Sequence, residues 1–172
     1  MKRILLTTLL ALNTSIVSAA VQYIYTGPSL NLAYFENVPV NESSYLPAGI
    51  TSITATLTLE EELGANHGMG QFIVSDFVIS DGASILTDSY GGVSLYAQIA
   101  TDQNGEIIDW DFWASMSPTL GVPYSIRSDK DSYDNSAYCH RLPCSYNPSD
   151  GDVEWATSTD GVGSWQVSPV PE

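Results

Sequence analysis

Aspartates are concentrated in two short stretches in the last third of the 172-residue chain. Carboxylate oxygens are the ligands that Ca²⁺ prefers, and extracellular modules often bind this ion weakly. The first stretch differs from an EF-hand loop because an aromatic residue occupies its fifth position and its sixth residue is not Gly. A loose calcium site is the hypothesis, and solvated loop carboxylates are the alternative. The residues of this predicted site are Asp129, Asp131, Asp134, Asp150 and Asp152.

Aromatic side chains form the second group with binding chemistry, because Trp and Tyr rings can stack on sugar rings. The chain has four Trp and ten Tyr. Trp113 is out of phase with the apolar residues of its predicted strand, so an exposed ring is expected there. Trp110 and Trp165 are expected in the core. The predicted ligand-binding residues are Trp113, Tyr124, Tyr133, Tyr138 and Tyr146.

No pattern typical of nucleophilic or metal-dependent catalysis occurs in the chain. Of the two histidines, His67 lies in a Gly-rich loop and is predicted to be exposed. A glycoside hydrolase needs two carboxyl groups that face each other across a cleft. Asp109 and Asp111 share one strand face, about 7 Å apart by strand geometry. No catalytic residue is predicted, and a polysaccharide hydrolase with an Asp/Glu pair is the alternative to a non-enzymatic role.

Cys139 and Cys144 are the two cysteines of the chain. In an oxidising compartment a closely spaced pair indicates a disulfide, and closing so short a loop stabilises by roughly 2 kcal/mol on the chain-entropy model. The spacing differs from that of redox-active CxxC motifs. A zinc site is disfavoured because His140 is the only further ligand nearby. A structural disulfide is therefore predicted.

The start of the chain indicates export. Lys2 and Arg3 precede an apolar stretch over 4–17, and small residues follow at Ser18, Ala19 and Ala20. This is the order of a secretory signal peptide, with cleavage after Ala19 or after Ala20. An uncleaved anchor is disfavoured because a spanning helix needs about 20 predominantly apolar residues. We therefore expect residues 1–20 to be a signal peptide and the protein to be secreted.

The net charge limits the classes of partner. The formal charge is −15 for the whole chain, and removal of Lys2 and Arg3 with the signal peptide makes it −17. Nucleic acids and anionic membranes are bound by clustered Lys and Arg, and the remaining chain has only Arg127, Lys130 and Arg141. A nucleic-acid partner and a membrane span in the mature chain are therefore not expected, and the composition suits one folded domain.

Apolar residues alternate with polar ones along most of the chain, which predicts β-strands. A phase shift within 71–80 predicts a bulge or two short strands. Strong helical spacing is absent, so the fold class is all-β, an antiparallel sandwich or jelly roll. The domain is expected over 21–168, with a C-terminal stub at 169–172. Residues 115–152 are predicted to form a long, disulfide-stapled loop region. The expected strands cover 21–26, 30–35, 53–59, 71–80, 92–101, 106–115, 153–157 and 165–167.

The strongest hairpin signal joins 92–101 to 106–115 through Asn104-Gly105. Alternation in the second strand predicts that Ile108, Trp110 and Phe112 face the core. Ile107 and Trp113 are expected on the opposite face with the two strand aspartates. That face is predicted to be partly open to solvent.

Three β-rich segments resemble a recurrent secreted domain of bacterial proteins that carry a PEP-CTERM sorting signal. They are TSITATLTL at 51–59, FVISDG at 77–82 and IATDQNGEIIDWDFWA at 99–114, and the chain ends in Val170-Pro171-Glu172. The resemblance implies export and an association with extracellular polysaccharide or biofilm. In that group a membrane helix and an Arg-rich tail follow this signal, so we expect either that the sequence is truncated before them or that this member is released without sorting.

Together these features predict a secreted extracellular or cell-surface-matrix protein with a binding or structural role. Polysaccharide is the expected partner, and calcium is the one cofactor that the residues suggest. The runner-up is the polysaccharide-active hydrolase.

Overall fold

The computed structural model describes residues 19–35, 49–116, 124–131, 134–139, 153–158 and 162–170. These residues form antiparallel β-strands without a helix, which confirms the all-β fold class. The strands are β1 (Val21–Phe35), β2 (Ser52–Leu59), β3 (Gly70–Gln71), β4 (Asp76–Ser80), β5 (Ile85–Thr87), β6 (Val93–Thr101), β7 (Ile107–Met116), β8 (Tyr124–Asp129), β9 (Asn135–Cys139), β10 (Val153–Ser158) and β11 (Ser164–Pro169).

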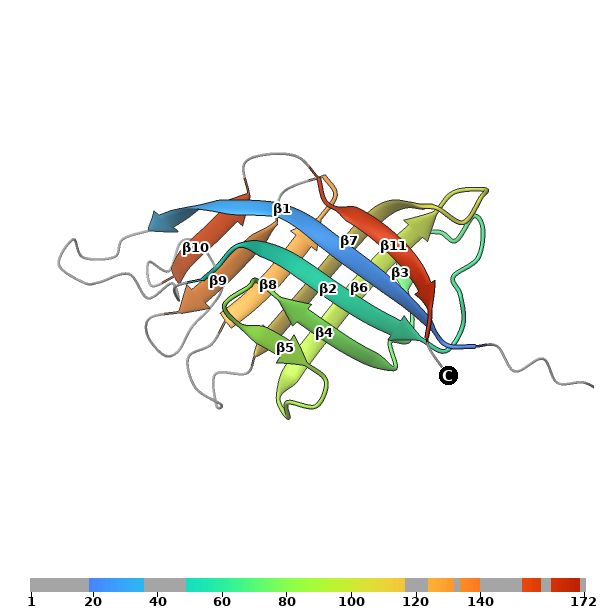
Figure 1. Cartoon of the computed structure of the whole chain (residues 1–172), viewed down its shortest axis with the longest axis horizontal. Helices are drawn as coiled ribbons and strands as arrows, with labels where there is room; N and C mark the ends of the chain where they lie inside the picture. Colours follow the sequence, from blue (N-terminus) through green and yellow to red (C-terminus); the bar gives the residue numbers. More distant parts are fainter. Residues whose placement is uncertain are drawn as a thin grey trace, which may run out of the picture.

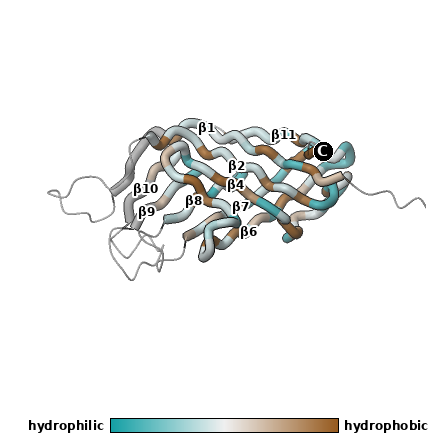
Figure 2. The backbone as a smooth tube through the Cα atoms, turned by 60° about the horizontal axis from the view of Figure 1, so that its bottom comes forward, coloured by the Kyte–Doolittle hydropathy of each residue, from teal (hydrophilic) through white to brown (hydrophobic). Residues whose placement is uncertain are grey.

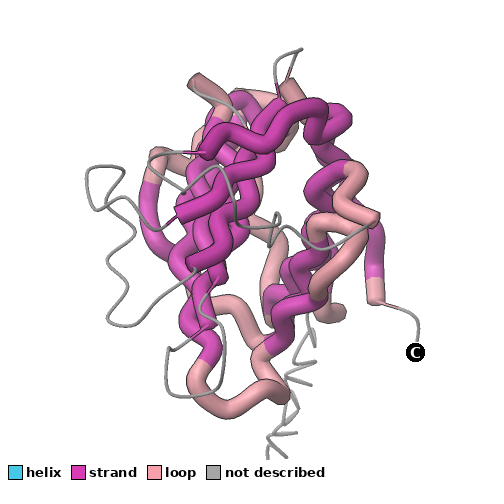
Figure 3. The backbone as a smooth tube through the Cα atoms, turned by 90° about the vertical axis from the view of Figure 1, so that its left-hand side faces the viewer, coloured by secondary structure: helices cyan, strands magenta, loops and turns pink. Residues whose placement is uncertain are grey.

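The strands form one sheet that curls around the core (Figures 1 and 3). β1 is the strand at which the sheet turns. Its first part pairs with β2 and β11, and its last part, from Leu30 to Phe35, pairs with β10. The register of β1 shifts between Thr26 and Ser29 where it pairs with β2, and between Leu30 and Leu32 where it pairs with β10. The result is a first arm, β11-β1-β2-β4-β5, and a second arm, β3-β6-β7-β8-β9-β10.

Alternating side chains from both arms fill the core. Figure 2 shows hydrophobic residues recurring along the strands rather than gathered in one segment. Tyr25 from β1 lies at the centre of an aromatic cluster, with ring centroids 5.3 Å from Phe112, 5.7 Å from Trp110 and 5.1 Å from Trp165. The tilted and edge-on packing of these rings is the arrangement that aromatic quadrupoles favour. The predicted core positions of Trp110 and Trp165 are therefore consistent with the structure.

The β6–β7 hairpin forms where Asn-Gly predicts it. Gly105 has a φ of 84°, which favours Gly because it lacks a Cβ. Asp102 Oδ1 accepts backbone hydrogen bonds from Asn104 at 2.7 Å and Glu106 at 3.0 Å. These bonds lower the pKa of Asp102. The side chain of Asp102 therefore fixes the turn that sets the register of β6 and β7.

One prediction about β7 is wrong. Trp110 and Phe112 face the core as expected, but Ile108 is 46% exposed and Ile107 packs against the core. The register shifts by one residue between Ala100 and Thr101, which pairs Thr101 with Ile107. A β-bulge of this kind reverses the alternation on one side of the irregularity. The residues from Asp109 onward keep the predicted phase.

Other boundaries also differ from expectation. The predicted break at Gly27-Pro28 is only a register shift within one long strand, β1. The 71–80 region forms two short strands, β3 and β4, as the phase shift suggests. Part of the predicted long loop consists of β8 and β9, which lie inside the sheet between β7 and β10. The short strand β5 was not predicted either, and it follows the Asp81-Gly82 turn.

Some predictions lie outside the described residues. These include most of the predicted signal peptide (1–18) and the end of the predicted C-terminal stub (171–172). Across the part of the chain that is described, none of the segments is a helix of the length and apolarity that membrane crossing requires.

Candidate functional site

The outward face of β6 to β9 presents a row of large side chains. Tyr96, Trp113, Arg127 and Asn135 are successive cross-strand partners on these four strands. Directly opposed residues of antiparallel strands project from the same face, with Cβ atoms about 4.5–5.5 Å apart. A second row beside it contains Gln98, Asp111 and Asp129. These seven residues are called the platform below.

Trp113 is the most exposed tryptophan for which the structure gives an accessibility. Its side chain is 41% exposed, whereas Trp110, three residues earlier on the same strand, is 5% exposed. The odd separation places the two rings on opposite faces of β7. The prediction that Trp113 faces solvent is therefore confirmed.

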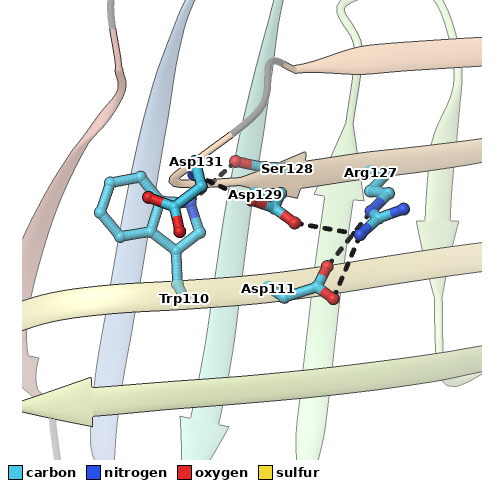
Figure 4. A network of polar contacts seen from close by, with 6 residues as sticks. All are labelled: Trp110, Asp111, Arg127, Ser128, Asp129 and Asp131. Carbon is cyan, nitrogen blue, oxygen red and sulfur yellow. Dashed lines mark hydrogen bonds and ion pairs between the residues drawn. The ribbon is translucent and has the colours of Figure 1, made fainter. Parts of the chain in front are cut away.

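Arg127 connects the two rows of the platform (Figure 4). Its guanidinium donates to both carboxylate oxygens of Asp111, at 3.2 and 3.3 Å, and to Asp129 Oδ2 at 3.0 Å. The bidentate contact fixes the plane of the Arg127 side chain. Solvent screens these ion pairs because the Arg127 side chain is 45% exposed, so they position groups more than they stabilise the fold.

The platform combines stacking surfaces with hydrogen-bonding groups. Two aromatic rings stand beside planar Arg, Asn, Gln and Asp groups, which can exchange hydrogen bonds with hydroxyl groups. Aromatic rings present an apolar body with a polar tip, and such residues are enriched where a ligand is partly apolar and partly wet. The platform is built on strands rather than loops, so its spacing is set by the sheet.

A pocket of about 350 Å³ adjoins the platform at Tyr96. It lies between β6 and the segment that connects β3 to β4. Asp88, just after β5, also lines it and hydrogen-bonds to Asp76. Desolvation, followed by this hydrogen bond and the adjacent negative charge, raises the pKa of Asp76. The apolar part of the lining consists of Phe72, Val74, Phe77, Leu95 and Ala97.

The predicted calcium ligands that are described do not converge. Asp129 belongs to the platform and contacts Arg127, Asp131 is exposed at the following turn, and Asp134 points into the core. Among the described residues, no group of three or more His, Cys, Asp or Glu is arranged to hold a metal ion. Asp150 and Asp152 lie outside the described residues.

The other predicted site residues have different placements. Tyr124 is a buried residue of β8, and its hydroxyl donates to the carbonyl of Ile85 at 3.1 Å. Its ring is therefore part of the contact between the two arms, and the prediction of a ligand-facing Tyr124 is not supported. Tyr133, Tyr146 and Cys144 lie outside the described residues, as do the side chains of Tyr138 and Cys139.

Two carboxylates are buried, Asp134, which was predicted as a calcium ligand, and Asp81, which the sequence did not single out. Asp134 is 3% exposed and accepts a hydrogen bond from the Tyr25 hydroxyl at 2.8 Å. Desolvation raises the pKa of Asp134, against the lowering effect of its hydrogen bonds with Ser128 and Tyr25. Asp81 is also buried and accepts from Ser136 Oγ at 2.9 Å. Their burial follows from hydrogen bonds between the two arms, and the sequence does not indicate it because each carboxylate and its partner are far apart in the chain.

His67 is half-buried, in contrast to the exposed loop residue that was expected. Its backbone N–H donates to Thr101 Oγ1 at 3.0 Å, and Thr101 Oγ1 donates to the carbonyl of Gly64. This loop is therefore fastened to the end of β6.

Within the described residues, two carboxylate pairs bear on the alternative of a hydrolase. Asp76 and Asp88 contact each other directly, and Asp109 and Asp111 lie side by side on one strand face. Glycoside hydrolases instead place two carboxyl groups about 5–10 Å apart on either side of the bond that is cleaved.

Comparisons of the chain with protein-family models, with curated proteins and with solved structures find no match.

Proposed function

We propose that this is a secreted extracellular or cell-surface-matrix protein with a binding or structural role, and that its platform contacts polysaccharide. The observation that carries the proposal is the exposed Trp113 ring, with Tyr96 on one side and the fixed Arg127 guanidinium on the other. If the exposed Trp113 ring had no ligand, its replacement by a polar residue would cost the protein little folding stability. Its position in a row of sugar-compatible groups supports a binding role.

The strand geometry supports a repeating ligand. The platform crosses four neighbouring strands, and neighbouring strands are about 4.8 Å apart. The row from Tyr96 to Asn135 therefore extends over about 14 Å, three times the strand spacing. A surface of this length offers several contacts along an extended chain, which suits a polymer better than a single small molecule.

Affinity gel electrophoresis tests the proposal. The wild-type protein and its Trp113→Ala variant are run in native gels that contain hydroxyethylcellulose, glycol chitosan or alginate. We expect at least one polysaccharide to retard the wild type, and Trp113→Ala to migrate as in a gel without polysaccharide. Ile108→Ala is the matched control, because Ile108 is an exposed apolar residue of the same strand but lies outside the platform.

Two outcomes would contradict the proposal. One is that the wild type is not retarded by any of the three polysaccharides. The other is that Trp113→Ala and Ile108→Ala reduce retardation equally, which would mean that general surface apolarity and not the platform is responsible.

A further inference from the structure

The turn between β6 and β7 contains the one Asn-Gly dipeptide of the chain, Asn104-Gly105. This dipeptide can modify itself, because Gly105 has no side chain to hinder its backbone nitrogen. That nitrogen, once deprotonated, attacks Cγ of Asn104 and closes a five-membered succinimide ring, while the bond to the side-chain nitrogen breaks and ammonia leaves. Water then opens the ring at one of its two carbonyls, which leaves aspartate or isoaspartate at position 104. Asn104 is exposed, so water reaches it.

Asp102 holds both reacting groups of the dipeptide. The N–H of Gly105 donates to the backbone carbonyl of Asp102 at 3.1 Å, so the attacking nitrogen is engaged as a donor. The side-chain amide of Asn104 donates to Asp102 Oδ2 at 3.2 Å, which directs it toward Asp102. The attack requires a Gly105 nitrogen without its proton and an Asn104 side chain turned toward that nitrogen. Both hydrogen bonds must therefore break before the ring can close.

Asp102 is itself held in place by the residues on either side of the turn. Its carbonyl also accepts from the N–H of Asn66 at 2.7 Å, and its own N–H donates to the carbonyl of Glu106 at 2.8 Å. Its Oδ1 accepts from the backbone N–H groups of Asn104 and Glu106. Native proteins open locally, with a free energy that depends on such bonds. The rate of the modification is therefore coupled to the opening of this turn.

We propose that Asn104 is a site of spontaneous deamidation, and that Asp102 sets its rate by holding the turn closed. The modification also alters the turn. A carboxylate at position 104 replaces an amide that donates to Asp102 Oδ2, so an attraction becomes a repulsion between like charges. Isoaspartate in addition lengthens the main chain at the turn that sets the register of β6 and β7, on which the pairing of Tyr96 with Trp113 depends.

Peptide mapping by mass spectrometry tests this proposal. The full-length wild type and its Asp102→Ala variant are incubated in a mildly alkaline buffer, digested, and assayed for the mass gain of deamidation at Asn104. We expect the native wild type to be modified at least about tenfold more slowly than the same chain in urea, and Asp102→Ala to be modified about tenfold faster than the native wild type. Asn66 is the internal reference, because it is also exposed but precedes His67, whose side chain hinders the attack.

Two further variants separate the hydrogen bonds from other effects. Asp102→Asn keeps an oxygen acceptor for the two backbone N–H groups, so its rate should lie between those of the wild type and Asp102→Ala. Glu106→Gln removes a negative charge from the same turn and leaves Asp102 in place, so it should be modified at the wild-type rate.

Three outcomes would overturn the proposal. The first is a native wild type that is modified as fast as the chain in urea. The second is an unchanged rate in both Asp102 variants. The third is equal acceleration by Glu106→Gln and Asp102→Ala, which would mean that the charge of the turn, and not its hydrogen bonds, controls the rate.

Discussion

The two faces of β7 contain the same kinds of residue in opposite environments. On the inner face, Trp110 packs against Tyr25 and donates its indole N–H to Ser128 Oγ at 3.0 Å. On the outer face, Trp113 has Tyr96 and Arg127 as cross-strand neighbours and remains open to solvent. Each face also has aspartates nearby, Asp134 inside and Asp111 outside.

The difference shows that residue type alone does not separate structural groups from binding groups here. The inner aromatic residues and the Asp134 carboxylate are packed against one another in the core, so a ligand does not reach them. The outer ones are held in register by the sheet, and their rings and polar edges still face water. The inner face therefore contributes stability, and our proposal places binding on the outer face.

The largest expected difference in the free energy of unfolding is between substitutions at two adjacent residues of β7, Phe112 on the inner face and Trp113 on the outer face. Phe112→Ala removes a fully buried ring from the aromatic cluster and should lower the free energy of unfolding by about 3–5 kcal/mol. Trp113→Ala should change it by no more than about 0.5 kcal/mol. Urea denaturation of both variants measures this contrast. A loss of similar size in the two variants would mean that the outer face is also part of the core.

A smaller loss is expected from Tyr25→Phe. The substitution removes the hydroxyl that donates to Asp134 Oδ1 and leaves a buried carboxylate oxygen without this bond. Such a loss costs about 1–3 kcal/mol. Tyr90→Phe is the control, because Tyr90 is 60% exposed and its hydroxyl should contribute little. Equal unfolding midpoints in urea for wild type and Tyr25→Phe would show that the buried hydrogen bond contributes nothing.

The pH dependence of stability reports on Asp134. Because burial raises its folded-state pKa above the unfolded value of about 3.9, its contribution to stability is fully present below about pH 4 and is lost as pH rises through the folded pKa. Asp134→Asn does not titrate. We therefore expect the variant to melt at a higher temperature than the wild type at pH 7, because ionising the buried Asp134 carboxyl costs the wild type stability at that pH.

This advantage of Asp134→Asn should shrink toward zero near pH 3 in thermal melts. All other carboxyl groups are common to both proteins, so their titration cancels in the difference. A variant that melts below the wild type by a constant interval at every pH would contradict the raised pKa.

The smallest expected effect on stability comes from the platform ion pairs. Arg127→Ala should lower the free energy of unfolding by less than about 1 kcal/mol, because the Arg127 side chain is nearly half exposed. High salt should reduce this difference further. Arg127→Lys keeps the charge but loses the planar bidentate contact, so it should recover stability without recovering polysaccharide retardation. Full recovery of both by Lys would show that only charge matters.

Much of the fold could be predicted from local pattern. Period-two alternation located β2, β6 and β7, and Asn104-Gly105 identified the hairpin. The phase of β7 from Asp109 onward also separated Trp110 from Trp113. These features are local, because a strand's two faces are encoded in neighbouring residues.

The remaining features depend on long-range pairing. β8 and β9 were not predicted because their buried residues include Ser128 and Ser136, which break the usual apolar alternation. Their hydroxyl groups are hydrogen-bonded in the core by Trp110, Asp134 and Asp81, which lie elsewhere in the chain. The reversal at Ile108 depends on a bulge opposite Ala100 and Thr101, which the hairpin sequence does not indicate by itself.

The candidate site was predicted in part for the same reason. Trp113 could be identified from strand phase, but its neighbours Tyr96 and Arg127 depend on the register of β6 and β8. Tyr124 was assigned to a ligand-binding loop, whereas it forms part of the contact between the arms. The pocket combines the β3–β4 connection, β6 and Asp88, and no sequence motif joins these segments.

The most direct test of the central claim is a titration of ¹⁵N-labelled protein followed through its tryptophan indole N–H signals. The titrants are the cellohexaose and glucosamine hexamer oligosaccharides, and the signals of Trp110 and Trp113 are assigned from Trp110→Phe and Trp113→Phe variants. The account predicts that at least one oligosaccharide shifts the Trp113 signal in a saturable way, while the Trp110 signal, whose donor is bonded to Ser128 inside the core, stays in place. A Trp113 signal that does not move with either oligosaccharide would contradict the assignment of the outer face of β7 as the binding surface.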